Sequence, residues 1–165
     1  MLMSEIDYVI PGIVVEKEGI VDISDLYKLM RNWLEKRDYS VVEKEYVDEV
    51  AEKSSISIKW EGEKDVDDYT RFIIKVGIKG KVENVRLKKK NAVKGVISIK
   101  FESCMEQDYE EKWENSPVFK FFRGIFDKYG MKNRFNKYSK ELRENTYDLY
   151  YEVKAYLGLL KTVEK

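Results

Sequence analysis

The sequence predicts one α+β domain in which a mostly antiparallel sheet of about five strands is covered on one face by three helices. Apolar and charged residues alternate with a period of two through the middle of the chain, and segments with helical spacing precede and follow this region. No repeat, low-complexity tract or Pro/Ser-rich linker divides the chain. Residues 1–165 are therefore treated as a single two-layer domain.

The first apolar segment runs from Tyr8 to Ile23 and contains Pro11, Gly12 and Gly19. It predicts either an irregular first strand or a short hairpin that turns near Glu18 and Gly19.

A helix is expected from Ser24 to Arg37. Ser24 is a good N-cap residue, and Asp25 places a negative charge in the first turn. Apolar residues then follow at helical spacing: Leu26, Leu29, Met30, Trp33 and Leu34.

The alternation begins at Tyr39 and predicts the sheet. It is clearest in three runs of apolar residues separated by polar ones: Ile56, Ile58 and Trp60; Phe72, Ile74, Val76 and Ile78; and Ile97, Ile99 and Phe101. Weaker runs contain Val42 and Tyr46, and Val85 and Leu87. Such alternation is typical of antiparallel strands with one buried and one solvated face. The turns are expected at Glu61–Asp68 and Lys88–Lys94.

Two helices are expected after Cys104. Ser116 and Pro117 form a strong start signal for a short Phe-rich helix, Pro117–Tyr129. The last helix, about Phe135–Leu160, has one apolar stripe: Phe135, Tyr138, Leu142, Leu149, Val153, Tyr156, Leu157 and Leu160. We expect Trp33, Trp60 and Leu149 to be buried between helices and sheet.

The order of these elements from Tyr39 to Leu160 resembles that of helix-grip domains of the START/polyketide-cyclase type. That resemblance implies a curved sheet around a long C-terminal helix, with an apolar ligand held between them. The pocket would be lined by Trp60, Phe72, Ile74, Ile99 and Phe101.

Composition predicts a cytoplasmic protein. Cys104 is the only cysteine, which excludes an intramolecular disulfide and fits a reducing compartment. The longest stretch without a charge, Tyr8 to Val15, has eight residues, whereas a membrane-spanning helix needs about 20. Met1–Asp7 has no basic region typical of a signal peptide. The high Lys and Glu content is typical of a heat-adapted source, although an A/T-rich genome would give similar usage.

The usual catalytic residues are missing. The chain has no histidine, which excludes Ser-His-Asp and Cys-His arrangements, and one cysteine cannot build a thiolate zinc site. No P-loop or Ser-x-x-Lys motif occurs. Glu102 and Glu106 near Cys104 would raise the pKa of its thiol, so we expect it to be inert. These observations predict a non-enzymatic domain without a cofactor or metal.

The acids Glu61, Glu63, Asp65, Asp67 and Asp68 could hold a hard cation, but they lack the spacing of an EF-hand loop. A solvated charged turn is the simpler interpretation.

Charge is strongly segregated in the second half of the chain. Glu102–Glu114 has six acids and one base, whereas Pro117–Lys140 has seven bases and one acid among many aromatic residues. The second segment predicts an interaction site for a protein or an anionic surface, formed by Lys120, Arg123, Lys128, Lys132 and Arg134. The alternative is that its phenylalanines cover the sheet while its bases face water.

A second basic cluster follows the predicted strands: Lys79, Lys81, Arg86, Lys88, Lys89, Lys90 and Lys94. Lysines on a solvated strand also prevent unwanted strand pairing. The balance of 31 basic and 31 acidic residues does not indicate specific nucleic-acid binding. The sequence therefore predicts a binding domain that docks a protein or an anionic surface, with an apolar-ligand domain as the alternative.

Overall fold

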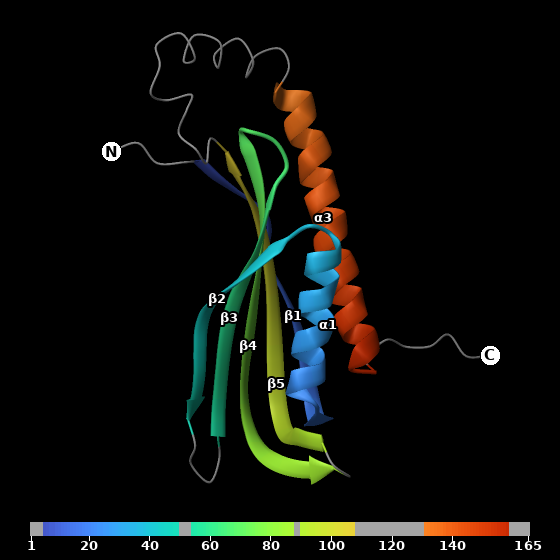
Figure 1. Cartoon of the computed structure of the whole chain (residues 1–165). Coiled ribbons are helices and arrows are strands. Elements are labelled where there is room, and N and C mark those ends of the chain that lie inside the picture. The colour runs from blue at the N-terminus through green and yellow to red at the C-terminus, as the bar shows by residue number, and fades with distance from the viewer. Residues whose placement is uncertain (1–4, 50–53, 88–89, 108–130, 159–165) are drawn as a thin grey trace, which may run out of the picture.

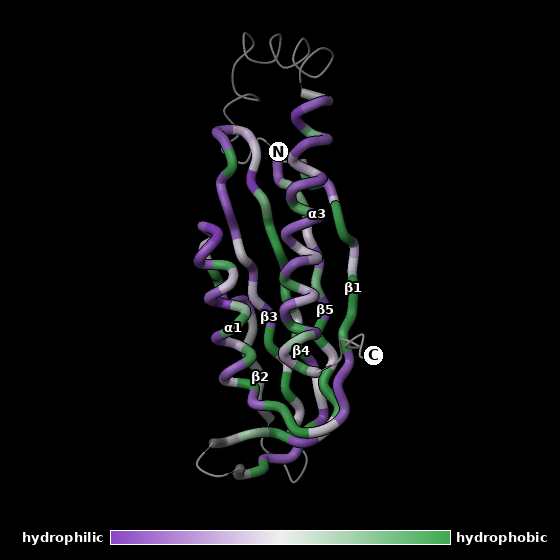
Figure 2. Tube along the Cα trace, turned by 90° about the vertical axis from the view of Figure 1, so that its right-hand side faces the viewer, coloured by the Kyte–Doolittle hydropathy of each residue, from purple (hydrophilic) through white to green (hydrophobic). Residues whose placement is uncertain are grey.

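The computed structural model describes residues 5–49, 54–87, 90–107 and 131–158, and it shows an α+β fold. In the described part of the chain, five antiparallel strands form one open sheet in the order β1-β5-β4-β3-β2. The strands are β1 (Glu5–Val21), β2 (Ser40–Glu49), β3 (Ser54–Asp65), β4 (Thr70–Leu87) and β5 (Lys90–Gln107). The helices α1 (Ile23–Lys36) and α3 (Met131–Tyr156) lie side by side on the same face of the sheet (Figures 1 and 2).

The first apolar segment is one strand of 17 residues with irregular register, so the predicted irregular strand is confirmed and the alternative, a hairpin near Glu18 and Gly19, is wrong. Gly19 has a φ of 137°, which a glycine adopts without strain, and it stays within the strand opposite Gly95. The ladder between β1 and β5 shifts register on either side of Ile10, just before Pro11. Because β1 is an edge strand, Pro11 removes no hydrogen bond that a further strand needs.

Strand β4 combines two strands that the alternation predicted separately. It runs for 18 residues and pairs with β3 on one side and β5 on the other. Similarly, β5 extends to Gln107, beyond the predicted end at Cys104. The tight turn between β3 and β4 spans residues 66–69, which is shorter than the predicted Glu61–Asp68.

Helix α1 begins one residue before its predicted N-cap. Asp22, and not Ser24, is the N-cap, and its Oδ1 accepts a hydrogen bond of 3.0 Å from the backbone N–H of Asp25. The helix buries Leu26, Met30, Trp33 and Leu34 against the sheet. At its C-terminal end the Arg37 guanidinium lies 3.9 Å from the centre of the Trp33 ring.

Helix α3 is held to three other elements by polar contacts. Tyr138 Oη donates to Asp67 in the β3–β4 turn (2.9 Å), and Asn145 Nδ2 donates to Tyr39 Oη (3.2 Å). Tyr156 Oη donates to the Asp22 carbonyl (3.4 Å). Leu142, Leu149, Val153 and Leu157 are buried, as the predicted stripe requires, but Tyr156 is 39% exposed.

The core lies between the two helices and the facing side of the sheet. Trp33, Trp60 and Leu149 are all buried there, which confirms the predicted core positions. The predicted Phe-rich helix, Pro117–Tyr129, lies outside the described residues. Neither described helix is long and apolar enough to cross a membrane.

Candidate functional site

The two faces of the sheet differ in chemistry, most clearly along β4. On β4, Phe72, Ile74, Val76 and Ile78 are buried beneath the helices. The residues between them, including Lys75, Gly77 and Lys79, point to the opposite side, which we call the open face. Because both described helices lie on the other side of the sheet (Figure 1), the open face carries the polar half of the alternation.

A hollow of about 480 Å³ lies on the open face and reaches from β2 across to β1. Five lysines line it, one from β2, one from β3, two from β4 and one from β5: Lys44, Lys59, Lys75, Lys79 and Lys100. Glu61 and Glu102 line the same hollow, as do Gly77, Ser98 and Val14. We call this hollow the lysine trough.

Gly77 forms the centre of the trough. Across the two neighbouring ladders it is paired with Lys59 on β3 and with Lys100 on β5. A Cβ atom built on Gly77 would meet no heavy atom within 4 Å, so the glycine leaves open space between the two lysines. Two residues further along β4, Lys79 is paired with Ser57 and Ser98.

Only part of the positive charge of the trough is balanced by its own glutamates. Lys100 Nζ lies 2.9 Å from Glu102, and Lys44 Nζ lies 3.9 Å from Glu61. Lys79 faces only serines on the adjacent strands. Lys59 is opposite Glu45 of β2. The lining of the trough itself contains five lysines and two glutamates, and so has more basic than acidic residues.

Lys75 stands at the end of the trough nearest Tyr8, and its Nζ lies 5.6 Å from the centre of the Tyr8 ring. Partial burial lowers the pKa of Lys75, but the negative forms of Cys104, Tyr8 and Glu61 outweigh burial and raise it. Lys75 therefore stays positively charged at neutral pH.

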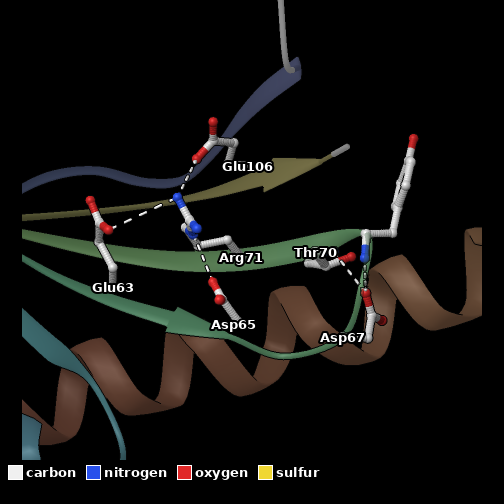
Figure 3. Close-up of polar contacts among 7 residues, drawn as sticks. Glu63, Asp65, Asp67, Thr70, Arg71 and Glu106 are labelled. Atoms are coloured by element: carbon white, nitrogen blue, oxygen red, sulfur yellow. Dashed lines mark hydrogen bonds and ion pairs between the residues drawn. The ribbon is translucent and has the colours of Figure 1, made fainter. Parts of the chain in front are cut away.

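Beyond Lys75 the open face becomes acidic around Arg71 (Figure 3). The Arg71 guanidinium lies 2.7 Å from Asp65, 3.9 Å from Glu63 and 3.7 Å from Glu106. Three of the acids near this turn thus surround a fixed cation of the protein itself. Among the described residues, no group of His, Cys, Asp or Glu is arranged to hold a metal ion.

Asp67 has a structural role in the same turn. Its Oδ1 accepts hydrogen bonds from the backbone N–H groups of Tyr69 (2.8 Å) and Thr70 (2.7 Å), as Figure 3 shows. Its Oδ2 accepts from Tyr138 of α3 and lies 4.0 Å from Arg134. Asp67 therefore stabilises the turn, whereas Glu61, Glu63 and Asp65 of the acidic run lie within β3 and not in a turn.

Cys104 is on the open face, paired with Ile73 and Tyr8, yet only 1% of it is exposed. Burial raises the pKa of its thiol to about 11, with nearby Lys75 opposing this and Glu61, Glu106 and Glu102 adding to it. The thiol is therefore protonated at neutral pH and is a poor nucleophile.

The structure describes little of the predicted basic interaction segment. Lys120, Arg123 and Lys128 lie outside the described residues, and for Lys132 only the backbone in the first turn of α3 is described. Arg134 is described, is 61% exposed and lies 4.0 Å from Asp67.

The five residues proposed for an apolar pocket, Trp60, Phe72, Ile74, Ile99 and Phe101, belong to the core between sheet and helices. Each is at most 1% exposed. The lysine trough lies on the other face of the sheet and includes only Trp60 of these five.

Lys79 belongs to the second predicted basic cluster, but Lys59, Lys100 and Gly77 were not predicted as site residues. The sequence does contain a signal for these residues. Each of the three central strands has a lysine or a glycine among the polar positions that alternate with its apolar residues. The lysines are separated by about 20 residues along the chain, so grouping bases by sequence position did not bring them together.

A scan against models of protein families gives no match to the chain, and a search of curated proteins gives none either.

Proposed function

We propose that this protein is a non-enzymatic binding domain and that its lysine trough binds an anionic small molecule. The observation that carries the proposal is the excess of positive charge around a hollow of about 480 Å³. Pockets for small molecules commonly have volumes of about 300–1,000 Å³. The trough therefore has the size of a ligand site as well as the charge of one.

The cost of building the trough also supports the proposal. Lys59 and Lys100 lie on either side of Gly77, two strand spacings apart, which is roughly 10 Å between their Cα atoms. A glycine in mid-strand costs about 0.5–1 kcal/mol relative to alanine, so strand stability does not account for Gly77. A bound anion would use the space above the glycine.

The local chemistry favours binding over catalysis. The open face offers ammonium and hydroxyl groups, which bind anions well but do not transfer protons readily at neutral pH. The raised pKa of Cys104, about 11, keeps the neighbouring thiol protonated.

The proposal is tested by isothermal titration calorimetry with inositol hexakisphosphate as a polyanionic probe at low ionic strength. Replacing Lys59, Lys79 and Lys100 together by glutamine should weaken binding at least about tenfold, because hydrogen bonds to charged groups are the strong ones. Binding by the unchanged protein should also weaken as salt increases.

The matched control removes three lysines from the helix layer. Lys28 and Lys36 on α1 and Lys140 on α3 are all exposed, and replacing them by glutamine changes the net charge by the same amount. This variant should bind the probe as the unchanged protein does. Equal loss in both triple variants would show that only net charge matters and would contradict a site in the trough.

The basic aromatic segment Pro117–Lys140 remains a separate proposal for an anionic surface, supported by its seven bases against one acid. The double change Lys120→Glu and Arg123→Glu should reduce cosedimentation with anionic vesicles at low salt. If it leaves cosedimentation unchanged, this segment is not the docking site.

A further inference from the structure

We propose that the lysine trough is a seat for a phosphate monoester, with the phosphate group placed over Gly77 between Lys59, Lys79 and Lys100. This rests on the proposed function and makes it specific in both position and ligand chemistry. Three features support it: the arrangement of the three lysines, the charge and oxygen atoms of a phosphate monoester, and the acidic residues around the trough.

The pairing of the strands places three lysines around one backbone position. Lys59 and Lys100 are the direct cross-strand neighbours of Gly77, and Lys79 is the next residue of β4 on the same face. In the structure Lys100 Nζ is paired with Glu102 at 2.9 Å and lies beside Gly12, and Lys59 is opposite Glu45. Lysine side chains are long and flexible, so a phosphate over Gly77 would draw both ammonium groups toward it. Since a Cβ on Gly77 would meet nothing within 4 Å, a group of several atoms fits above it.

Three cations around one point suit phosphate better than carboxylate. A phosphate monoester carries close to two negative charges at neutral pH and offers three acceptor oxygens. A carboxylate has one charge and two oxygens. Lysine binds phosphate as a point charge, so it needs no planar, two-pronged partner. The Ser98 hydroxyl, opposite Lys79, adds a donor at the edge of the seat.

Acidic residues limit the seat and argue against a long polyanion. Glu61 and Glu102 flank Lys75 at one end, and Glu83 follows Lys81 on the same face of β4 at the other. Glu16 is opposite Ser98 at the β1 edge. An extended nucleic-acid backbone would meet carboxylates in each of these directions, whereas a single phosphate group would not.

An apolar side chain borders the seat and can contact the organic part of the ligand. Val14 of β1 lines the trough opposite Lys100, and 48% of it is exposed. A compact phosphorylated molecule can therefore bind its phosphate over Gly77 and rest its apolar part against Val14. A phosphorylated lipid headgroup offers the same monoester chemistry.

The decisive experiment compares phenyl phosphate with benzoate by calorimetry on the full chain. Phenyl phosphate should bind more tightly, and its affinity should rise as the pH increases through about 6, where the second ionisation of a phosphate monoester occurs. Benzoate is ionised throughout and should show no such rise. Equal binding of the two compounds would overturn the choice of phosphate.

The position of the seat is tested by Gly77→Val, which fills the space between Lys59 and Lys100 without removing a charge. We expect affinity for phenyl phosphate to fall at least about tenfold, because one extra methylene in a binding pocket typically changes affinity by about 10–200-fold. Ser55→Val is the matched control, because Ser55 lies on the same face of β3, opposite Lys81 and outside the trough lining. It should bind phenyl phosphate normally.

The two sets of variants distinguish a failure of the phosphate position from a failure of anion binding as a whole. If Gly77→Val folds and binds normally while the triple lysine variant does not bind, the seat over Gly77 is wrong and the anion-binding function stands. If the triple variant also binds normally, both proposals fail. Thermal unfolding checks that Gly77→Val is folded, and Gly77→Ala, which adds one methyl group, serves if it is not.

Vesicles of phosphatidylcholine containing phosphatidylinositol 4-phosphate identify the source of the phosphate. Binding to these vesicles that phenyl phosphate displaces, and that Gly77→Val loses, would support a lipid headgroup in the same seat. Binding of phenyl phosphate without vesicle binding would support a soluble ligand. Vesicle binding that phenyl phosphate does not displace would contradict a shared monoester seat.

Discussion

The two faces of the sheet are built from the same strands, yet they follow different rules. On β4, every second residue from Phe72 to Ile78 is buried by helices α1 and α3, and each fills space in the core. On the open face Lys75, Gly77 and Lys79 fill no core and line the lysine trough. Residues that the fold does not need, and that it tolerates at some cost, are the stronger indication of function.

The largest difference between the faces should appear when side chains are truncated. Leu149→Ala, beneath α3, should cost roughly 2–5 kcal/mol of unfolding free energy, because it removes a fully buried leucine and leaves a cavity. Lys79→Ala on the open face should change it by less than about 0.5 kcal/mol. Urea unfolding measures both changes, and a small effect at Leu149 would show that α3 does not pack as described.

Two glycines on β4 allow the same substitution to be compared on the two faces. A Cβ on Gly80 would lie 2.7 Å from the Val96 carbonyl oxygen, and 3.3 Å from Ile97, so Gly80→Ala should cost about 1–3 kcal/mol. Gly77→Ala meets nothing and should be neutral or stabilise by up to about 1 kcal/mol. Equal effects at the two positions would contradict the difference between the faces. Thermal and urea unfolding decide between these results.

Cys104 sharpens the comparison because it is a buried residue on the open face. Its pKa is raised to about 11 in the folded protein, above the ordinary thiol value of 9.0, so the folded state holds its proton more tightly. Stability should therefore be lost as the pH rises from about 9 to 11, by about 1 kcal/mol after allowance for solvent screening. The loss should be smaller in Cys104→Ala. An identical pH profile for the two proteins would contradict the raised pKa.

A smaller effect than in the core is expected at the acidic end of the open face. Arg71→Met leaves Glu63, Asp65 and Glu106 without their shared cation and should cost roughly 0.5–1 kcal/mol, as for a partly exposed ion pair. Added salt should reduce this cost, because it screens repulsion between the carboxylates. Urea unfolding at low and high salt measures it. A cost that is unchanged by salt would indicate lost packing and not lost charge.

Much of the local structure could be predicted from the sequence. The alternation around Ile58, Phe72–Ile78 and Ile97–Phe101 identified strands and their buried face correctly, since period two is a direct consequence of strand geometry. The errors occurred where local signals were ambiguous. Gly19 indicated a turn but lies within β1, and Asp22 and Ser24, two residues apart, are both good N-cap residues.

The candidate site was much harder to predict. The bases of the predicted clusters were grouped because they are neighbours in the chain, as in Lys79 and Lys81. The trough instead joins Lys59, Lys79 and Lys100, each from a different strand. Their meeting depends on strand order and on register, and a shift of one residue would turn a lysine to the other face.

The sequence by itself determined the α+β class, the buried face of the central strands and the two described helices, because these follow from periodicity within each segment. Only the tertiary structure decided that β1 pairs with β5, the last strand in the described part of the chain, and that Gly77 lies between Lys59 and Lys100. The reason is physical: side-chain periodicity is local, whereas strand pairing is selected by how the whole set of apolar faces is buried together.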